Sequence, residues 1–285
     1  MNKINLGCGN RFHKDWLNLD FVSNHPDVIA HDLKKGLPYS DGSFTAIYHS
    51  HVLEHFTIKD AKNFMKECYR ILEKDGVIRM VIPDLEMICR LYIENLEKAI
   101  SGDKLAEEKY QWMKIELLDQ LTRNHSGGEM LEYWKQNPMP AEEFVIERTG
   151  GEVLGFLRYY RSLILSNHET SPNERKSIEK KNKSILNIWK EKIIEYLIQN
   201  TKYKLITEEM ENFIKIGKFR LSGEIHQWMY DRYSVSKLID EVGFKDIKQV
   251  SASESDIPNF QSYNLDTDED GRTRKPDSLF MEARK

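Results

Sequence analysis

The chain has 285 residues, of which 40% are hydrophobic and 31% are charged, which suits one large domain or one domain with a big insertion. Its 46 acidic and 42 basic residues leave a net charge of −4, which argues against a nucleic-acid partner held through its phosphates. No apolar run approaches the roughly 18 residues of a membrane span, and the N-terminus lacks the apolar stretch of a signal peptide. Three cysteines without Cys-x-x-Cys spacing predict reduced thiols and a cytoplasmic location.

Short strand-like segments fill the first part of the chain. Apolar residues and period-two alternation predict strands, in chain order, at residues 3–6, 16–20, 27–33 and 44–52. Only 11 positions separate Gly9 from Asp20, which is too few for a full helix between the first two strands. We therefore expect a tight connection or a single turn there.

A helix and a buried strand follow. Thr57 and Asp60 form a capping-box-like start, and apolar residues at helical spacing continue from residue 61 to residue 72. Gly76 is expected to end this helix. Residues 77–84 form a nearly continuous apolar run halted by proline, which is typical of a strand covered on both faces in a parallel sheet. Strands that alternate with helices predict an open α/β fold.

Glycine and polar residues gather at the predicted strand ends. Open α/β sheets bind ligands outside the carboxyl ends of their strands. Those ends carry Gly7, Gly9, Asp20, Asp32, His51, His55, Pro83 and Asp84. One carboxylate there can accept hydrogen bonds from both ribose hydroxyls, and a second can accept one from an adenine amino group. The two glycines permit positive φ and a close backbone approach, so the pattern predicts a nucleoside-like cofactor.

Four stretches resemble the class I S-adenosylmethionine-dependent methyltransferases. They are "INLGCGN", "WLNLD", "AHDLKKGLPYSDGSFTAIYHSHVLEHF" and "LEKDGVIRMVIPD". The resemblance covers residues 1–94 and resumes over residues 226–285, where "YSVSKLIDEVGFKDIKQV" is similar to the late helix and strand of that fold and "DSLFMEARK" to its final strand. It implies a Rossmann-like α/β sheet, mostly parallel with an antiparallel last strand, and a large, mostly helical insertion over residues 95–225.

The same resemblance implies S-adenosyl-L-methionine as the cofactor. The implied cofactor turn is formed by Gly7 and Gly9, and the implied ribose ligand is Asp20. The adenine would lie between Asp32 and Leu33. The methionine moiety and the reactive methyl group would lie near Ser50, His51 and Leu53.

The histidines around the fourth strand allow two interpretations. His49, His51 and His55 suggest a metal cluster at first sight. Along a strand, His49 and His51 share a face, whereas His55 lies beyond the strand end. With no cysteine nearby and no carboxylate other than Glu54, we expect no metal. His51 is instead expected to line the site, with general-base catalysis as an alternative role because its ordinary pKa is near 6.5.

The middle of the chain, residues 95–225, has a different pattern. Helical periodicity is found at residues 104–121 and 184–200, and residues 176–183 are rich in charge, as a solvated helix face would be. An insertion at this point projects over the strand ends, so we interpret it as a lid or substrate subdomain. A dimerisation arm that produces a homodimer is the alternative, and both roles can hold together.

Two short stretches are expected to contact the substrate. "RNHSGGEM", residues 123–130, sets Arg123 and His125 beside a mobile Gly-Gly turn. "GEIHQWMYDRYS", residues 223–234, is where the chain re-enters the sheet domain, and it contributes His226, Tyr230 and Arg232. His226 is the first choice for a base if the acceptor is a hydroxyl, and Arg232 could hold a phosphate or carboxylate in bidentate fashion.

The acceptor is the least defined part of the hypothesis. No Asn-Pro-Pro-Tyr loop of the amide-methylating kind is present, which favours an oxygen acceptor. Residues 264–285 are predicted to form a polar hairpin that leads into the last strand. Together with the short start, this tail resembles methyltransferases of bacterial surface-sugar and polysaccharide clusters, and a sugar, glycan or other small polar metabolite would be methylated. The alternatives are a small-molecule N-methyltransferase and a cofactor-binding protein without turnover.

Overall fold

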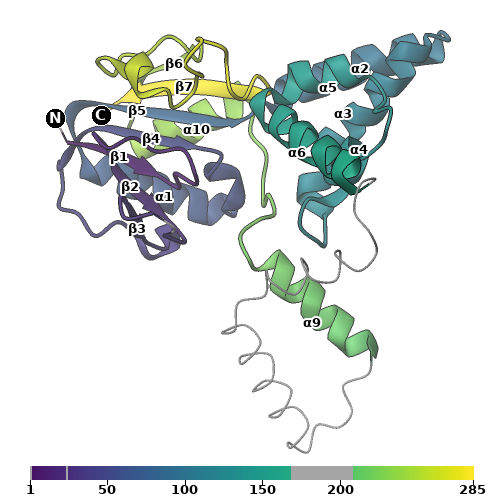
Figure 1. Cartoon of the computed structure of the whole chain (residues 1–285). Coiled ribbons are helices and arrows are strands. Elements are labelled where there is room, and N and C mark those ends of the chain that lie inside the picture. The colour runs from purple at the N-terminus through teal and green to yellow at the C-terminus, as the bar shows by residue number, and fades with distance from the viewer. Residues whose placement is uncertain (1, 24, 168–207) are drawn as a thin grey trace, which may run out of the picture. The chain divides into compact units, whose positions relative to one another are not determined.

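The computed structural model describes residues 2–23, 25–167 and 208–285, and Figure 1 shows the arrangement of their elements. The chain divides into two compact units, residues 1–154 with 223–285 and residues 155–222. The first unit contains the whole sheet. The predicted helix at 184–200 and the charge-rich residues 176–183 lie outside the described residues.

A seven-stranded sheet organises the first unit, in the order β3-β2-β1-β4-β5-β7-β6. The strands are β1 (Lys3–Leu6), β2 (Leu17–Asp20), β3 (Val28–Ala30), β4 (Phe44–Ser50), β5 (Leu72–Pro83), β6 (Lys245–Val250) and β7 (Ser278–Arg284). The first five strands are mutually parallel, and β7 runs antiparallel to both β5 and β6. This confirms the predicted mostly parallel sheet with an antiparallel last strand, and it brings the carboxyl ends of β1 to β5 to one edge.

The sheet is covered on both faces, as the apolar run of β5 predicts. On one face, α1 (Ile58–Ile71) and α10 (Arg232–Val242) pack against the sheet, and Figure 1 shows both helices beside the strands. The predicted apolar residues of α1 are all buried there: Ala61, Phe64, Met65, Cys68 and Ile71. On the other face, the segment after β6, which includes the short helix η3 (Phe260–Tyr263), packs on Trp16, Tyr48 and Val81.

The end of α1 differs from the expectation. The helix stops at Ile71, and β5 begins at Leu72, so Gly76 lies inside a strand and does not end the helix. The reason is that the extended Leu72 pairs with Phe44 of β4 and is fully buried. Gly76 has a packing role, since a Cβ atom there would lie 2.8 Å from Leu72 Cγ.

Helices of the inserted region also belong to the first unit. They are α2 (Leu85–Ile100), α3 (Lys104–Thr122), α4 (Gly128–Trp134), α5 (Glu142–Thr149) and the start of α6 (Gly151–Asn167). The predicted helix at 104–121 is confirmed by α3, which Asp103 caps by accepting a hydrogen bond from the Ala106 amide. Short 3-10 helices at Leu33–Lys35 (η1) and Leu53–His55 (η2) complete this unit.

The second unit, residues 155–222, is described in two parts. It contains the rest of α6 and the helix α9 (Glu208–Arg220). The rings of Phe156 and Tyr160 stack along α6 with centroids 5.3 Å apart. Among the helices that the structure describes, none is both long and apolar enough to cross a membrane.

Candidate active site

The glycine turn after β1 has the conformation that the sequence predicts. Gly7 and Gly9 adopt φ values of +67° and +53°. The amides of Gly7 and Cys8 both donate to the Leu19 carbonyl, at 2.8 and 3.0 Å, and thereby tie the turn to β2. The connection from Gly9 to β2 contains no helix, as the short spacing predicts. A Cβ atom on Gly9 would have no protein atom within 4 Å, so the backbone here faces open space.

Two cavities flank this turn. The Asp20 cavity, about 220 Å³, is lined by Gly9, Asn10, Phe12, Asp20, Val22, His25 and Val28. The glycine cavity, about 360 Å³, is lined by Asn5, Gly7, Cys8, Gly9, Asn10, Arg11, Tyr48, Ser50, His51, Arg274 and Lys275. Because Gly9 and Asn10 line both, the two cavities adjoin at the turn. The wall of the Asp20 cavity includes the carboxylate of Asp20, and the wall of the glycine cavity includes several kinds of polar side chain.

The aspartates at the ends of β2 and β3 have different surroundings. Asp20 accepts a hydrogen bond from the Gly9 amide, 2.7 Å from Oδ2, so its carboxylate is held at the cavity wall. Asp32 instead caps η1, because its Oδ1 accepts from the Lys34 amide at 3.1 Å. Neither Asp32 nor Leu33 lines the Asp20 cavity or the glycine cavity.

A third cavity lies next to the glycine cavity. This histidine cavity, about 400 Å³, has walls from η2, α3, α4, α5 and the segments around Glu224 and Asp277. Its polar lining includes His51, His55, Arg123, His226, Lys275 and Asp277. His51 and Lys275 line both the glycine cavity and the histidine cavity, so these two side chains mark the junction.

His51 reaches this junction through an unusual backbone conformation. Its φ is +54°, which is uncommon for a residue with a side chain, and its amide donates to the Val81 carbonyl at 2.8 Å. The expectation that His49 and His51 share a strand face is therefore wrong, because β4 ends at Ser50. His49 is fully buried against Phe64, with ring centroids 5.4 Å apart, whereas His51 Nε2 lies 2.8 Å from Ser278 Oγ.

Glu54 and three histidines form a buried cluster at one end of the histidine cavity. His51 Nδ1 lies 3.3 Å and His226 Nε2 4.0 Å from Glu54 Oε1. Burial raises the pKa of Glu54 to about 8 and lowers the pKa of His51 and of His226 well below the ordinary value. At neutral pH these groups are therefore held uncharged rather than as ion pairs, and the histidines keep a free lone pair.

The residues predicted to contact substrate are divided between the cavity and other places. Arg123 lines the histidine cavity, where it forms ion pairs with Asp119 and Glu224. His226 lines it as well, whereas His125 is exposed and does not. Tyr230 is a core residue, and burial raises the pKa of its hydroxyl to about 12.

Two further predicted site residues lie outside the three cavities. Arg232 begins α10 on the surface and pairs with Glu86, with 2.8 Å between Nε and Oε2. It therefore lies away from the three cavities, and its role as an anion clamp stays a prediction. Leu53 is fully buried in the core. Position along the chain alone does not say where a side chain points.

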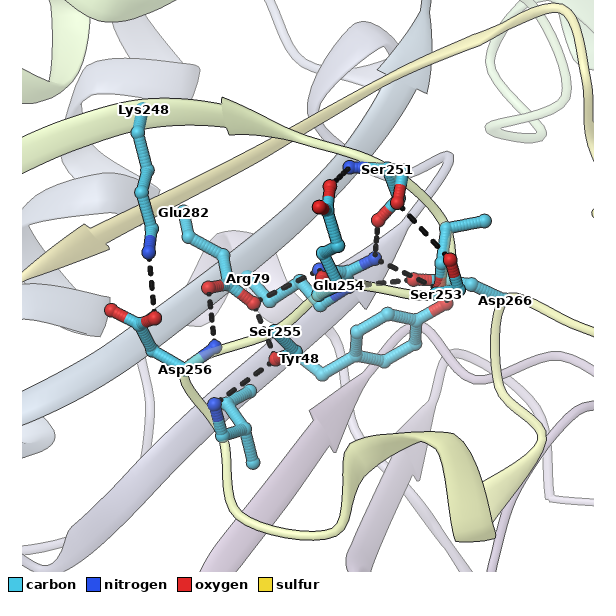
Figure 2. A network of polar contacts seen from close by, with 12 residues as sticks. Tyr48, Arg79, Lys248, Ser251, Ser253, Glu254, Ser255, Asp256, Asp266 and Glu282 are labelled. Atoms are coloured by element: carbon cyan, nitrogen blue, oxygen red, sulfur yellow. Dashed lines mark hydrogen bonds and ion pairs between the residues drawn. The ribbon is translucent and has the colours of Figure 1, made fainter.

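A buried polar network holds the C-terminal wall of the site (Figure 2). Arg79 on β5 is fully buried, and it donates to Asp266 at 2.6 Å and to Glu282 at 2.9 Å. Tyr48 donates its hydroxyl to the other oxygen of Asp266. Asp266 begins the polar hairpin predicted before the last strand, where Thr267 pairs with Thr273 and the Arg274 amide donates to the Asp266 carbonyl. The network thus anchors the segment that carries Lys275.

Sequence reasoning missed Arg79 and Lys275. An arginine within the apolar run "VIRMVIP" was the available signal for a buried ion pair, because a charged group on a doubly covered strand requires a partner. Lys275 has no comparable local signal. It reaches the junction because the hairpin folds back onto the sheet.

Comparison with known proteins gives the following similarities. Residues 5–80 match the family described as "Methyltransferase domain". None of the curated proteins matches the chain. One similar solved structure is a S-adenosylmethionine-dependent methyltransferase from Thermotoga maritima, described as a "possible histamine N-methyltransferase", with 25% identity and a TM-score of 0.27 over 34% of this chain and 52% of that one. The match thus spans about half the length of the Thermotoga protein.

Two other solved structures align over the whole chain. A S-adenosylmethionine-dependent methyltransferase from Archaeoglobus fulgidus has 9% identity and a TM-score of 0.37, covering 100% of this chain and 86% of that one. Phosphoethanolamine N-methyltransferase 1 of Haemonchus contortus, in complex with phosphoethanolamine and S-adenosylhomocysteine, has 12% identity and a TM-score of 0.27, covering 100% of this chain and 87% of that one.

Proposed function

We propose that this protein is an S-adenosylmethionine-dependent methyltransferase that methylates a hydroxyl of a sugar, glycan or other small polar metabolite. The match of residues 5–80 to the methyltransferase-domain family supports the first part of this proposal. One observation carries the proposal. The glycine cavity, suited to the cofactor, and the histidine cavity, suited to a polar acceptor, share His51 and Lys275 as walls. A methyl group held where the two cavities adjoin would lie next to an acceptor bound in the histidine cavity.

Two structural features support placing the cofactor in the Asp20 cavity and the glycine cavity. The open space above Gly9 leaves room for a ligand that approaches the backbone closely. The carboxylate of Asp20 is held at the wall by the Gly9 amide, where its remaining acceptor capacity suits the ribose hydroxyls. We assign the methionine end of the cofactor to the glycine cavity, beside Ser50 and His51. Contact of Asp32 and Leu33 with the adenine stays part of the proposal.

The cofactor supplies a sulfonium-bound methyl group that is already electrophilic. The protein then has to align the acceptor, and positioning of this kind can lower a barrier by about 7–11 kcal/mol. A hydroxyl acceptor must also lose a proton, which a placed histidine speeds by about 10²–10⁴-fold. His226 and His51 are the candidate bases, because burial keeps both rings uncharged and both line the histidine cavity.

The lining of the histidine cavity supports a polar acceptor. Lys275, Asp277 and Glu152 offer charged or hydrogen-bonding groups, while Trp134 and Met130 offer apolar surface suited to a ring face. Such a mixture is typical of pockets that bind hydroxylated rings. Because α3, α4 and α5 supply much of this wall, the structure supports a substrate role for the early part of the inserted region.

A homodimer through the inserted region belongs to the same proposal. In the second unit, α9 exposes 65% of Phe213 and 43% of Ile214, which are adjacent apolar residues on a charged helix. These exposed side chains are the feature from which the homodimer is proposed. Light scattering on the full chain tests it, because Phe213→Glu should convert a dimer into a monomer.

Two measurements test the proposed activity. Calorimetry should detect binding of S-adenosylmethionine and of S-adenosylhomocysteine. A panel of acceptors, matched in size and bearing either a hydroxyl or an amine, should then give S-adenosylhomocysteine release with the hydroxyl compounds. Turnover of amines alone would establish the N-methyltransferase alternative. Binding with no turnover across sugars, glycans and small polar metabolites would favour a cofactor-binding protein without catalysis.

A further inference from the structure

The cluster at the end of the histidine cavity has the composition of a metal site. Glu54 and His55 come from η2, and His226 comes from the segment that returns to the sheet. One potential ligand atom from each residue lies within 4.8 Å of the others. The rings of His55 and His226 meet edge to face with centroids 4.9 Å apart. Two imidazoles and one carboxylate form a ligand set that proteins use for divalent metals.

The carboxylate of Glu54 lacks the partners that its burial requires. Its side chain is 1% exposed, and neither oxygen accepts a hydrogen bond from any residue that the structure describes. A buried carboxyl group without a donor is costly, and native proteins satisfy such groups by pairing or by metal coordination. A cation between Glu54 and the two imidazoles would supply the missing partner.

The surrounding contacts orient the three candidate ligands. His55 Nδ1 lies 3.1 Å from the Ile225 carbonyl, so this nitrogen donates and Nε2 keeps its lone pair. A hydrogen bond from the second ring nitrogen to a backbone carbonyl is the usual support for a metal-bound histidine. The backbone of Glu54 is also fixed, because its carbonyl accepts from the amides of Gln227 and Trp228 at 2.7 and 3.2 Å.

We propose that Glu54, His55 and His226 bind one divalent cation of the Zn²⁺ or Mn²⁺ class, with an open coordination position toward the histidine cavity. His55 and His226 line that cavity, so a ligand inside it would have access to the metal. Two nitrogen donors disfavour Mg²⁺ and Ca²⁺, which prefer oxygen. The cation would polarise a hydroxyl in the cavity and lower its pKa, an effect that rests on the proposed function.

Metal binding at this site would give His226 and His51 different roles. With the metal bound, the lone pair of His226 is committed to coordination. His51 remains as the proton acceptor, because it is not one of the three proposed ligands and it lines both the histidine cavity and the glycine cavity. Metal binding and proton removal can therefore be separated by mutation.

Metal binding is tested on the tag-free full chain after chelator treatment and dialysis. Titration with Zn²⁺ and with Mn²⁺ should show one equivalent bound per chain, and Co²⁺ should give a visible absorption band. Glu54→Gln and His226→Ala should each weaken Zn²⁺ binding by about 100-fold or more. The matched control is His13→Ala, which removes a histidine near the β1–β2 connection and should leave binding unchanged.

The outcomes distinguish this site from the proposed function. Absence of metal binding by the parent protein, or equal binding by the parent and Glu54→Gln, overturns the site. Each variant is also titrated with S-adenosylhomocysteine, whose affinity should stay within about threefold of the parent value and thereby reports a folded chain. Metal binding without any affinity for S-adenosylhomocysteine would overturn the proposed function and leave the metal site standing.

Discussion

Arg79 Nε lies 2.6 Å from Asp266 Oδ2, and both side chains are buried, 187 residues apart in sequence. Glu282 pairs with the same guanidinium at 2.9 Å, and the carbonyls of Ser251, Ala252 and Glu254 accept its remaining donors. One cation therefore joins β5, β7 and the hairpin that carries Lys275. Loss of this cation would leave two buried carboxylates without their partner.

The first prediction concerns the stability of this network. Arg79→Met should lower the free energy of unfolding by about 3–5 kcal/mol, the range for breaking a buried pair by removing one partner. The matched control is Arg284→Met, on neighbouring β7. Arg284 pairs with Asp256 at 2.9 Å but remains 36% exposed, so its loss should cost about 1 kcal/mol or less. Urea titration followed by circular dichroism measures both, and equal losses would contradict the account.

The second prediction concerns His49, whose two ring nitrogens have no hydrogen-bond partner within the described residues. Burial lowers the pKa of folded His49 to about 3, against 6.5 for an ordinary histidine. Between these values the unfolded state binds a proton that the folded state excludes, so stability falls as the pH drops below 6.5. Through His49 alone, the free energy of unfolding should be lower by about 3 kcal/mol at about pH 4 than at neutral pH.

Replacement by an apolar residue tests this sign. His49→Leu should raise stability near pH 7 by about 1 kcal/mol, because it removes two unsatisfied buried atoms. It should also flatten the acid side of the stability profile relative to the parent. His13→Ala, at a partly exposed histidine, serves as the control for the loss of an imidazole outside the core. A parallel acid slope in the parent and His49→Leu would show that His49 does not control it.

The sequence could predict features that depend on local pattern. Strand alternation, the helical spacing of residues 61–72 and the glycine turn each follow from neighbouring residues. The sheet and the position of the glycine turn at its edge could therefore be predicted. Features that depend on contacts between residues far apart in the sequence could not be predicted in this way. The extended Leu72 depends on Phe44, the positive φ of His51 on the end of β4, and the burial of Arg79 on Asp266. Chain order alone cannot supply those contacts.

The third prediction separates two glycines of the same turn. Both have positive φ, so alanine at either position should cost about 1–2 kcal/mol of backbone strain. A Cβ atom at Gly7 would additionally lie 2.4 Å from Val52 Cγ2, whereas one at Gly9 would enter open cavity space. Gly7→Ala should therefore be the less stable variant by thermal melting. Gly9→Ala should lose less stability than Gly7→Ala. For the stability that it does lose, it should lose more affinity for S-adenosylhomocysteine.

The fourth prediction concerns the carboxylate of Asp20. Asp20→Asn should weaken binding of S-adenosylmethionine by about 10–100-fold, because hydrogen bonds to a charged acceptor contribute about 1.5–3 kcal/mol. The control is Asp32→Asn, which should keep the η1 cap and change affinity less. Calorimetry with S-adenosylmethionine and its demethylated product measures both. Parent-like affinity in Asp20→Asn would remove Asp20 from the cofactor site.

The fifth prediction uses the backbone strain at His51. Asparagine and glycine both tolerate positive φ, so His51→Asn and His51→Gly should keep the backbone conformation and remain folded. Neither can accept the acceptor's proton as an imidazole does, so kcat should fall by about 10²-fold or more with a hydroxyl acceptor. With an amine acceptor that is already neutral at high pH, the decrease in kcat should be smaller.

Because His51 also lines the glycine cavity, the KM for S-adenosylmethionine is measured in parallel and should change less than kcat. Variants that are stable and retain parental kcat would show that the strained backbone at this junction serves packing rather than proton transfer.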